Sequence, residues 1–292
     1  AGNGFSLDHQ PPYHPSAYRP PLYPMMLAAI MKTTTHWETW LFIVQCLFGV
    51  AATWVAFLLG SRLFGVTPGL MAAWFTALHP YIGLWVQLTH TESLQTLLLV
   101  LLTYFLVRSV RDRQLRWVVS SGVVTGLAVL TRAEFLFLPV LMVVGLLFQR
   151  LPWRLRVRQA VIVCLVSAVL VMPWTVRNYV HMKRFIPVSD AAAKLMFWSA
   201  TLSPEEFDQR FTLGGQPPHL KFEERYPFVT PFKDFYSYVG GGTREPDITL
   251  EEFQAIEQQM LELGLANVAK DPAGFLWRRI KDVPYTWIES GN

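Results

Sequence analysis

The sequence predicts an all-α polytopic membrane protein, with about six transmembrane helices and an extracytoplasmic C-terminal segment of loops and amphipathic helices. Of the 292 residues, 52% are hydrophobic and only 16% are charged, whereas soluble proteins carry about 25% charged residues. Three acidic residues lie between Thr39 and Trp174, but 16 of the 21 follow Trp174. We therefore expect an extracytoplasmic loop with a juxtamembrane helix (residues 1–38), a transmembrane bundle (39–176) and an extracytoplasmic segment truncated at its C-terminus (177–292).

Six uncharged windows support this organisation, because a charge at the bilayer centre costs roughly 3 kcal/mol. A perpendicular span needs about 20 residues. Three of the windows contain only 15, and they are expected to cross only if flanking arginines snorkel or if their ends open into a polar cavity. The six windows are residues 39–61, 63–91, 93–107, 117–131, 135–149 and 159–176.

Arginine-rich links predict the orientation of these helices. Arg108–Arg116 and Arg150–Arg158 each contain four arginines, and such links face the cytoplasm. Two short helices between them must then turn outside at Thr131–Glu134. Continuing the alternation places residues 1–38, His79–Glu92 and everything after Trp174 outside, so we expect a multi-pass inner-membrane protein with an extracytoplasmic active face.

The sequence argues against three other classes of protein: disulfide-bonded scaffolds, enzymes with known catalytic or nucleotide-binding motifs, and nucleic-acid-binding proteins. Cys46 and Cys164 lie inside apolar runs without metal-site spacing, which argues against a disulfide scaffold. No Walker loop, HExxH or nucleophile elbow is present. The clustering of arginines in short links favours membrane orientation over nucleic-acid binding.

The segments outside the bundle have recognisable patterns. Prolines in Tyr18–Pro24 predict an extended approach to a short apolar helix at Met25–Met31. Apolar periodicity predicts a helix over Leu250–Ala269. Asp271-Pro272 is typical of a helix start, and that amphipathic helix would extend to Trp287; Ser203–Thr249 is expected to form loops.

Glu92 is a candidate for chemistry because it is a carboxylate at the boundary of an apolar run. The alternative is an interfacial residue that is merely solvated. His90 and His79 would share its cavity, although an interfacial histidine is more often a hydrogen-bonded structural residue. His90 and Glu92 are the only close pair of metal ligands; two ligands do not make a site, so a divalent metal stays open and no cofactor is predicted with certainty.

Two arginines on the outer face are candidates for binding phosphate, since a guanidinium matches a phosphate as a bidentate fork. Arg132 lies in the outer turn; its alternative role is a local pair with Glu134. Arg177 follows the last window, where the pattern favours its alternative role, which is to anchor the helix at the interface beside Trp174 and Tyr179.

Five sequence pieces, in this order and spacing, resemble the bacterial membrane glycosyltransferases of the GT-C fold, in particular the protein mannosyltransferase and aminoarabinose transferase-like superfamily. The pieces are Gly2-Asn3-Gly4-Phe5-Ser6, Arg19-Pro20-Pro21-Leu22-Tyr23-Pro24, Thr91-Glu92-Ser93-Leu94, Gly126-Leu127-Ala128-Val129-Leu130-Thr131-Arg132, and Pro173-Trp174-Thr175-Val176-Arg177-Asn178-Tyr179 leading to Phe185-Ile186-Pro187-Val188-Ser189.

This resemblance implies transfer of a sugar from a polyprenyl-phosphate donor to a lipid, glycan or protein acceptor on the outer face of the membrane. It implies that the positive charge for the departing phosphate comes from arginines on that face, and that nearby polar residues support catalysis or line the pocket. The candidate phosphate ligands are Arg19, Arg132 and Arg177, the catalytic candidates are Glu92 and His90, and the pocket candidates are Tyr18, Tyr23, Glu134 and His79.

One departure from the family pattern concerns the principal catalytic carboxylate. In the family it lies in the first outer loop, ahead of the Gly-Phe-Ser piece, whereas Asp8 follows that piece here. We therefore expect the chain to be a fragment without its general base and first span, and to be inactive as it stands. The rival interpretations are a transporter or flippase for a lipid or amphiphile and an assembly subunit without chemistry.

The predicted orientation can be tested by cysteine labelling in intact cells. Cysteines placed at Arg113 and Arg154 should resist a membrane-impermeant reagent, because both lie in arginine-rich links. Cysteines at Ser6 and Gly241 should react. Labelling of the first pair from outside would reverse the orientation.

Overall fold

The computed structural model describes residues 4–6, 13, 15–149, 151–190, 197, 200–201, 226–229, 250–278 and 280. Within these ranges the regular structure is helical and contains no β-strand, so the all-α fold class is confirmed. The chain divides into one unit of Ala1–Phe5 with Pro15–Asp190 and a second of Ser6–His14 with Ala191–Asn292. We describe each unit by itself.

Three helices of the first unit are long and apolar enough to cross a membrane. They are α2 (Trp37–Phe64), α5 (Glu92–Asp112) and α8 (Trp153–Met182), and they confirm the helices expected at residues 39–61, 93–107 and 159–176. Each extends past its uncharged window, because charged residues near a helix end keep their heads at the interface while the backbone continues as helix.

Two shorter apolar helices lie on either side of the turn predicted at Thr131–Glu134. α6 (Leu115–Thr131) ends where expected, and the backbone of Arg132 is extended. A 3₁₀ turn, η1 (Ala133–Phe137), then leads into α7 (Leu138–Leu147). The turn at Thr131–Glu134 is therefore confirmed.

The window of residues 63–91 does not form one helix, contrary to the expectation of a crossing there. Gly65, at φ 101°, ends α2 and begins α3 (Val66–Ala77), and α4 (Pro80–Trp85) is only six residues long. Pro80 explains the break, since it donates no backbone hydrogen bond and disfavours helical geometry in the residue before it. At 1.5 Å per residue α3 is about 18 Å long, which is shorter than a hydrocarbon core of about 30 Å.

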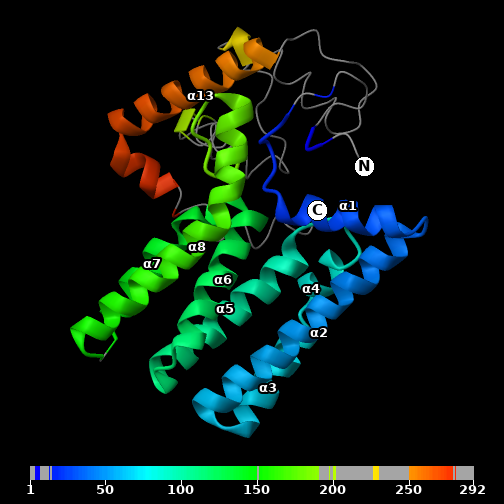
Figure 1. Ribbon diagram of the computed structural model, residues 1–292, viewed down its shortest axis with the longest axis vertical. Helices are drawn as coiled ribbons and strands as arrows, with labels where there is room; N and C mark the ends of the chain where they lie inside the picture. Colours follow the sequence, from blue (N-terminus) through cyan, green and yellow to red (C-terminus); the bar gives the residue numbers. More distant parts are fainter. Residues whose placement is uncertain are drawn as a thin grey trace. The chain divides into compact units, whose positions relative to one another are not determined.

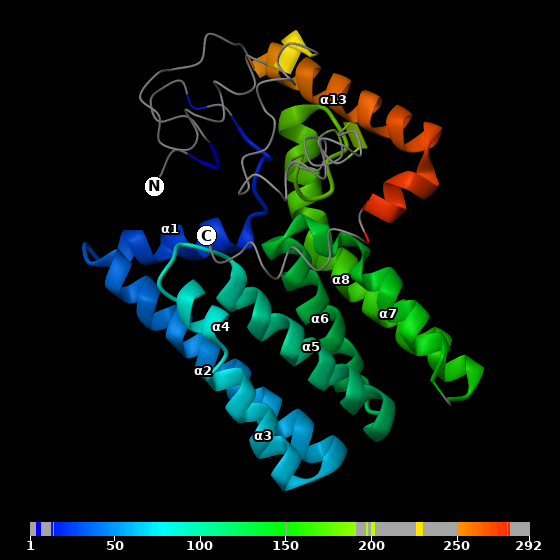
Figure 2. The ribbon, with the colours of Figure 1, turned by 180° about the vertical axis from the view of Figure 1, so that it is seen from behind.

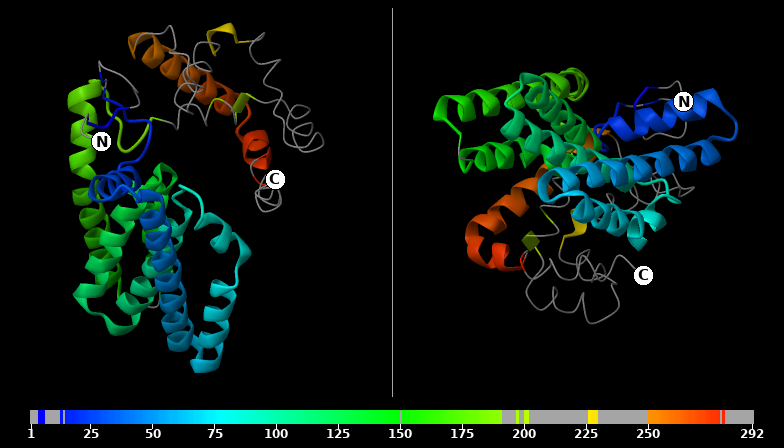
Figure 3. Two further views of the ribbon diagram at one scale, coloured as in Figure 1. Left: turned by 90° about the vertical axis from the view of Figure 1, so that its right-hand side faces the viewer. Right: turned by 90° about the horizontal axis from the view of Figure 1, so that it is seen from below.

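The juxtamembrane helix begins earlier than the prolines suggested. α1 spans Leu22–Thr33, so Pro24 lies in its first turn rather than in an extended segment. A proline is tolerated there because the first N–H groups of a helix have no intrahelical acceptor. The helix crosses one end of the bundle instead of running along it (Figures 1 and 3).

Glycines allow two pairs of helices to approach closely. A Cβ added at Gly60 on α2 would lie 2.9 Å from Cα of Gly69 on α3. On α6, a Cβ added at Gly122 would lie 2.7 Å from Cβ of Val166, and one at Gly126 would lie 3.0 Å from Cβ of Leu170. Gly126 lies four residues after Gly122, and its neighbour Leu170 lies four residues after Val166. The two helices therefore run in the same direction, side by side (Figure 2).

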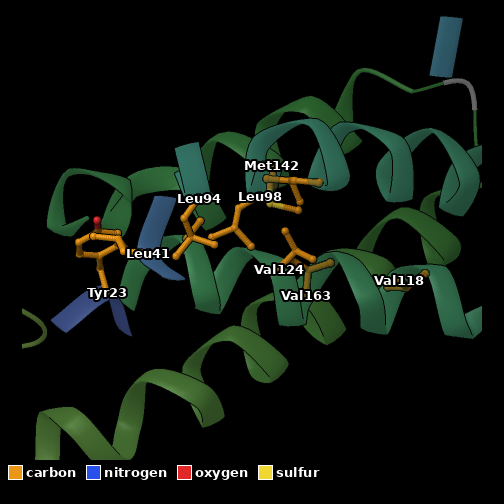
Figure 4. Close-up of a cluster of buried hydrophobic side chains, with 10 residues drawn as sticks. Tyr23, Leu41, Leu94, Leu98, Val118, Val124, Met142 and Val163 are labelled. Carbon is orange, nitrogen blue, oxygen red and sulfur yellow. The ribbon is translucent and has the colours of Figure 1, made fainter. Parts of the chain in front are cut away.

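The core of the first unit joins α1 to the long helices. Tyr23 on α1 packs with Leu41 on α2 and with Leu94 and Leu98 on α5 (Figure 4). Many large side chains on the outside are apolar and exposed, as expected for surfaces that face lipid; they include Trp54, Phe64, Phe75, Val140 and Val169.

The second unit contains α13 (Leu250–Lys270), which confirms the helix expected at Leu250–Ala269. Asp271 caps the following helical residues, since its Oδ1 accepts the Gly274 N–H at 2.9 Å. Predictions for Asp8 and Trp287, and for all of Ser203–Thr249 except Tyr226–Val229, lie outside the described residues.

The close approach of α6 and α8 predicts the effect of adding a single methyl group. Gly122→Ala should lower the free energy of unfolding by about 1–3 kcal/mol, because overpacking forces side chains and backbone to shift. Gly49→Ala is the matched control: its new Cβ would lie 3.9 Å from Ile82 Cγ2, and alanine is the better helix former by about 1 kcal/mol. Unfolding in mixed detergent micelles measures both, and equal stability of the two variants would contradict the packing argument.

Candidate active site

The candidate site lies where α5 begins and α6 ends. Arg132 donates from Nη1 to Oε1 of Glu92 at 2.7 Å and from Nε to Oε1 of Glu134 at 2.6 Å. Because the backbone of Arg132 is extended after the last turn of α6, its side chain reaches the first residue of α5. Two segments 40 residues apart in sequence are joined by this ion pair.

One carboxylate oxygen of Glu92 accepts a hydrogen bond from Arg132, and the other has no hydrogen-bond partner among the described residues. As the first residue of α5, Glu92 lies at the positive end of the helix dipole. The second oxygen, Oε2, is buried and accepts no hydrogen bond from the described residues. The His90 Nδ1 atom lies 3.9 Å from Oε2, and the His90 ring meets the edge of Trp85. The carboxylate therefore retains an acceptor that a ligand can use.

The charge on Arg132 is secured by its neighbours. Burial alone would lower the pKa of its guanidinium, but hydrogen bonds to Glu134 and Glu92, together with their charges, outweigh burial and raise the pKa. Its Nη2 group makes no hydrogen bond within the described residues. One edge of the guanidinium thus remains available.

Tyr23 adds a neutral donor close to this ion pair. Its side chain is 5% exposed, and its hydroxyl has no hydrogen-bond partner among the described residues. Burial, reinforced by the negative charge of Glu92, raises the pKa of Tyr23 to about 12. At neutral pH the phenol is therefore protonated and can donate a hydrogen bond.

Two further polar side chains at the start of α5 were not identified from the sequence. Ser93 and Gln95 are both buried, and neither the Ser93 hydroxyl nor the Gln95 amide has a hydrogen-bond partner in the described part of the chain. Buried polar groups are nearly always hydrogen-bonded, so this turn of α5 is suited to a polar ligand or to ordered water. The signal in the sequence was a polar start to an otherwise apolar window.

Arg177 is occupied by the protein's own backbone. Its Nη1 donates to the carbonyl oxygen of Ser16 at 2.6 Å and its Nη2 to that of Phe5 at 3.1 Å, while the guanidinium lies 4.7 Å from the centre of the Trp174 ring. These contacts give Arg177 a structural role. Phosphate binding by Arg177 stays a prediction.

The rest of the motif around Arg177 anchors the chain that follows α8. Trp174 Nε1 donates to the Val188 carbonyl oxygen at 2.7 Å, Thr175 Oγ1 donates to that of Pro187 at 2.7 Å, and the amide of Asn178 donates to that of Ile186 at 3.1 Å. The motif thus holds residues 186–188 against the helix.

The remaining predicted residues are placed as follows. The carbonyl oxygen of Tyr18 accepts the Ser189 hydroxyl at 2.6 Å. Arg19 is exposed, with its guanidinium 5.7 Å from the centre of the Tyr18 ring. His79 precedes α4, where its carbonyl oxygen accepts the Ile82 N–H. No three His, Cys, Asp or Glu side chains within the described ranges gather as metal ligands.

Comparison with known families places most of this site in one matched region. The model of the dolichyl-phosphate-mannose-protein mannosyltransferase family matches residues 18–176. No curated protein and no solved structure gives a significant match. The matched region contains Arg19, Tyr23, Glu92 and Arg132, whereas Phe5, Ser16 and Arg177 lie just outside it.

The two carboxylates around Arg132 should contribute unequally to stability. Glu92 is 28% exposed and joins two helices, whereas Glu134 is 55% exposed and only two residues away. A double-mutant cycle of Arg132→Ala with Glu92→Gln should give the larger coupling energy. The cycle with Glu134→Gln should fall at the lower end of the range of about 0–1 kcal/mol typical of exposed pairs. Both cycles are measured from unfolding free energies; a larger coupling to Glu134 would show that the pair is merely local.

Proposed function

Because the chain belongs to the dolichyl-phosphate-mannose-protein mannosyltransferase family, we propose that it transfers a sugar from a polyprenyl-phosphate donor to a lipid, glycan or protein acceptor. We place the reaction on the outer face of an inner membrane, as the arginine-rich links predict. Family membership favours this activity over lipid transport.

The observation that carries the proposal is the pairing of Glu92 with Arg132 at the membrane boundary. Sugar transfer with inversion needs a base for the acceptor hydroxyl and positive charge for the departing phosphate. The acceptor oxygen bonds to the anomeric carbon, its proton passes to a carboxylate, and the bond from that carbon to the phosphate oxygen breaks with its electron pair on the phosphate. The free Oε2 of Glu92 can support this step by accepting a hydrogen bond from the acceptor hydroxyl, and the cation beside it suits the phosphate.

Arg132 can bind a phosphate without losing Glu92. Its Nη2 group is unused, and its bond to Glu134 lies on the exposed side of the pair. The donor's phosphodiester, which becomes a dianionic phosphate as the sugar leaves, would compete with Glu134 for the guanidinium, while Glu92 keeps the side chain in place. Bidentate geometry of this kind is specific to arginine.

The surrounding residues are proposed as the pocket. Tyr23 offers its neutral hydroxyl beside the carboxylate, and His90 lies next to Oε2. We propose Arg19 as a second cation for the phosphate, since it is exposed and pairs with no carboxylate among the described residues. Tyr18, His79 and Glu134 complete the proposed acceptor side.

Steady-state kinetics of the full-length protein test these roles. Arg132→Ala should raise the Michaelis constant for the polyprenyl-phosphate sugar by roughly ten-fold or more, since a hydrogen bond to a charged group contributes about 1.5–3 kcal/mol; Arg132→Lys should raise it less. Glu92→Gln should instead lower turnover by roughly ten-fold or more. Arg116→Ala, which removes an arginine near the opposite end of α6, is the control and should leave both constants near wild type. Unchanged kinetics in Arg132→Ala would show that Arg132 does not contact the donor.

A further inference from the structure

A second candidate site lies at the opposite end of α5 from Glu92. The last turns of α5 and the length of α7 enclose a groove of about 720 Å³. Leu102, Leu106 and Val110 line it on α5, and Leu141 and Gly145 line it on α7. Its polar end is formed by Arg111, which lies in the first arginine-rich link, and by Gln149, which directly precedes the second.

The groove has the length of one lipid chain. It runs along α5 from Leu99 to Arg111, which is about 18 Å at a rise of 1.5 Å per residue. One leaflet of a bilayer has a hydrocarbon thickness of about 15 Å, half of the roughly 30 Å core. A single acyl chain in this groove would therefore reach from the interface to about the bilayer centre.

The charge at the polar end is unbalanced. Asp112 is the only acidic residue in either link, and it is shared by Arg62 and Arg108. Arg111 donates to the carbonyl oxygen of Arg62 at 2.6 Å and pairs with no carboxylate in the described part of the chain. A guanidinium with unused donors at the mouth of an apolar groove matches an anionic headgroup on a fatty chain.

We propose that this groove binds one anionic phospholipid of the leaflet beside the arginine-rich links, with an acyl chain between α5 and α7 and the headgroup phosphate against Arg111. The site is independent of sugar transfer, because Arg132 and Glu92 lie at the other end of α5. The charge favours this lipid over the donor's polyprenyl chain, whose phosphate would enter from the end of Arg132.

The test is lipid retention by the full-length protein. Purified protein is equilibrated with phosphatidylglycerol or phosphatidylcholine, and bound lipid is counted by native mass spectrometry. Wild type should retain phosphatidylglycerol in preference. Arg111→Gln should reduce that retention about five-fold, the equivalent of about 1 kcal/mol for one basic residue at a membrane surface.

Matched variants separate this site from general charge and from loss of fold. Arg116→Gln removes an arginine of the same link that does not line the groove, and it should retain wild-type binding. Gly145→Leu should fill the groove and abolish retention of both lipids, because a Cβ at Gly145 meets nothing within 4 Å. Gly83→Leu, also in open space but outside the groove, is its control.

Three results would overturn the proposal. These are equal retention of the two lipids by wild type, equal losses in Arg111→Gln and Arg116→Gln, and displacement of the bound lipid by polyprenyl phosphate in a manner that requires Arg132. The last result would assign the groove to the donor chain. Unfolding temperatures of all variants confirm that losses do not come from misfolding, and Arg111→Gln decides the question if Gly145→Leu is unstable.

Discussion

The hydrogen bonds of Arg177 hold together parts of the chain that are far apart in sequence. Its guanidinium binds carbonyl oxygens of Phe5 and Ser16, which precede it by 172 and 161 residues. Ser189 adds a bond to the carbonyl oxygen of Tyr18. These contacts fix the segment that enters α1 and so place Tyr23 in the core beside α5. An arginine suits this task because its fork of donors can bind two backbone carbonyl oxygens at once.

The site at the start of α5 depends on that placement. α1 brings the Tyr23 hydroxyl close enough to Glu92 for the carboxylate charge to help raise the phenol's pKa, and Arg132 links Glu92 to the end of α6. Tyr23, Glu92 and Gln95 each have a buried polar group with no hydrogen-bond partner among the described residues, which lowers stability unless a ligand or water satisfies it. A packed apolar core directly beneath tolerates this arrangement. Preorganised polar groups of this kind are what a transfer reaction requires.

The opposite end of α5 uses arginine differently. There Asp112 pairs with Arg62 of α2 and with Arg108 of its own helix, and Arg108 also lies 4.1 Å from the centre of the Trp117 ring. These contacts join this end of α5 to α2 and α6, while Arg111 pairs with no carboxylate in the described part of the chain. The same residue type therefore serves three purposes: binding backbone at the end of α8, pairing with a carboxylate at the proposed site, and presenting charge to lipid headgroups.

The sequence alone determined the features that depend on local composition. Uncharged windows located α2, α5, α6 and α8, the arginine-rich links required the turn at Thr131–Glu134, and the Asp271-Pro272 pair marked a helix start, because hydrophobic burial and capping act within a few residues of the chain. Only the tertiary structure decided which partners the polar groups find. In the sequence the only acidic residue close to Arg132 is Glu134. The hydrogen bond from Arg132 to Glu92 depends on how α5 and α6 pack. Arg177 binds carbonyl oxygens, which every residue carries and no sequence pattern distinguishes. The absence of charge in residues 63–91 likewise does not reveal that Gly65 and Pro80 divide this window into separate helices. Apolar residues are favoured in lipid whether or not the helix that carries them is continuous.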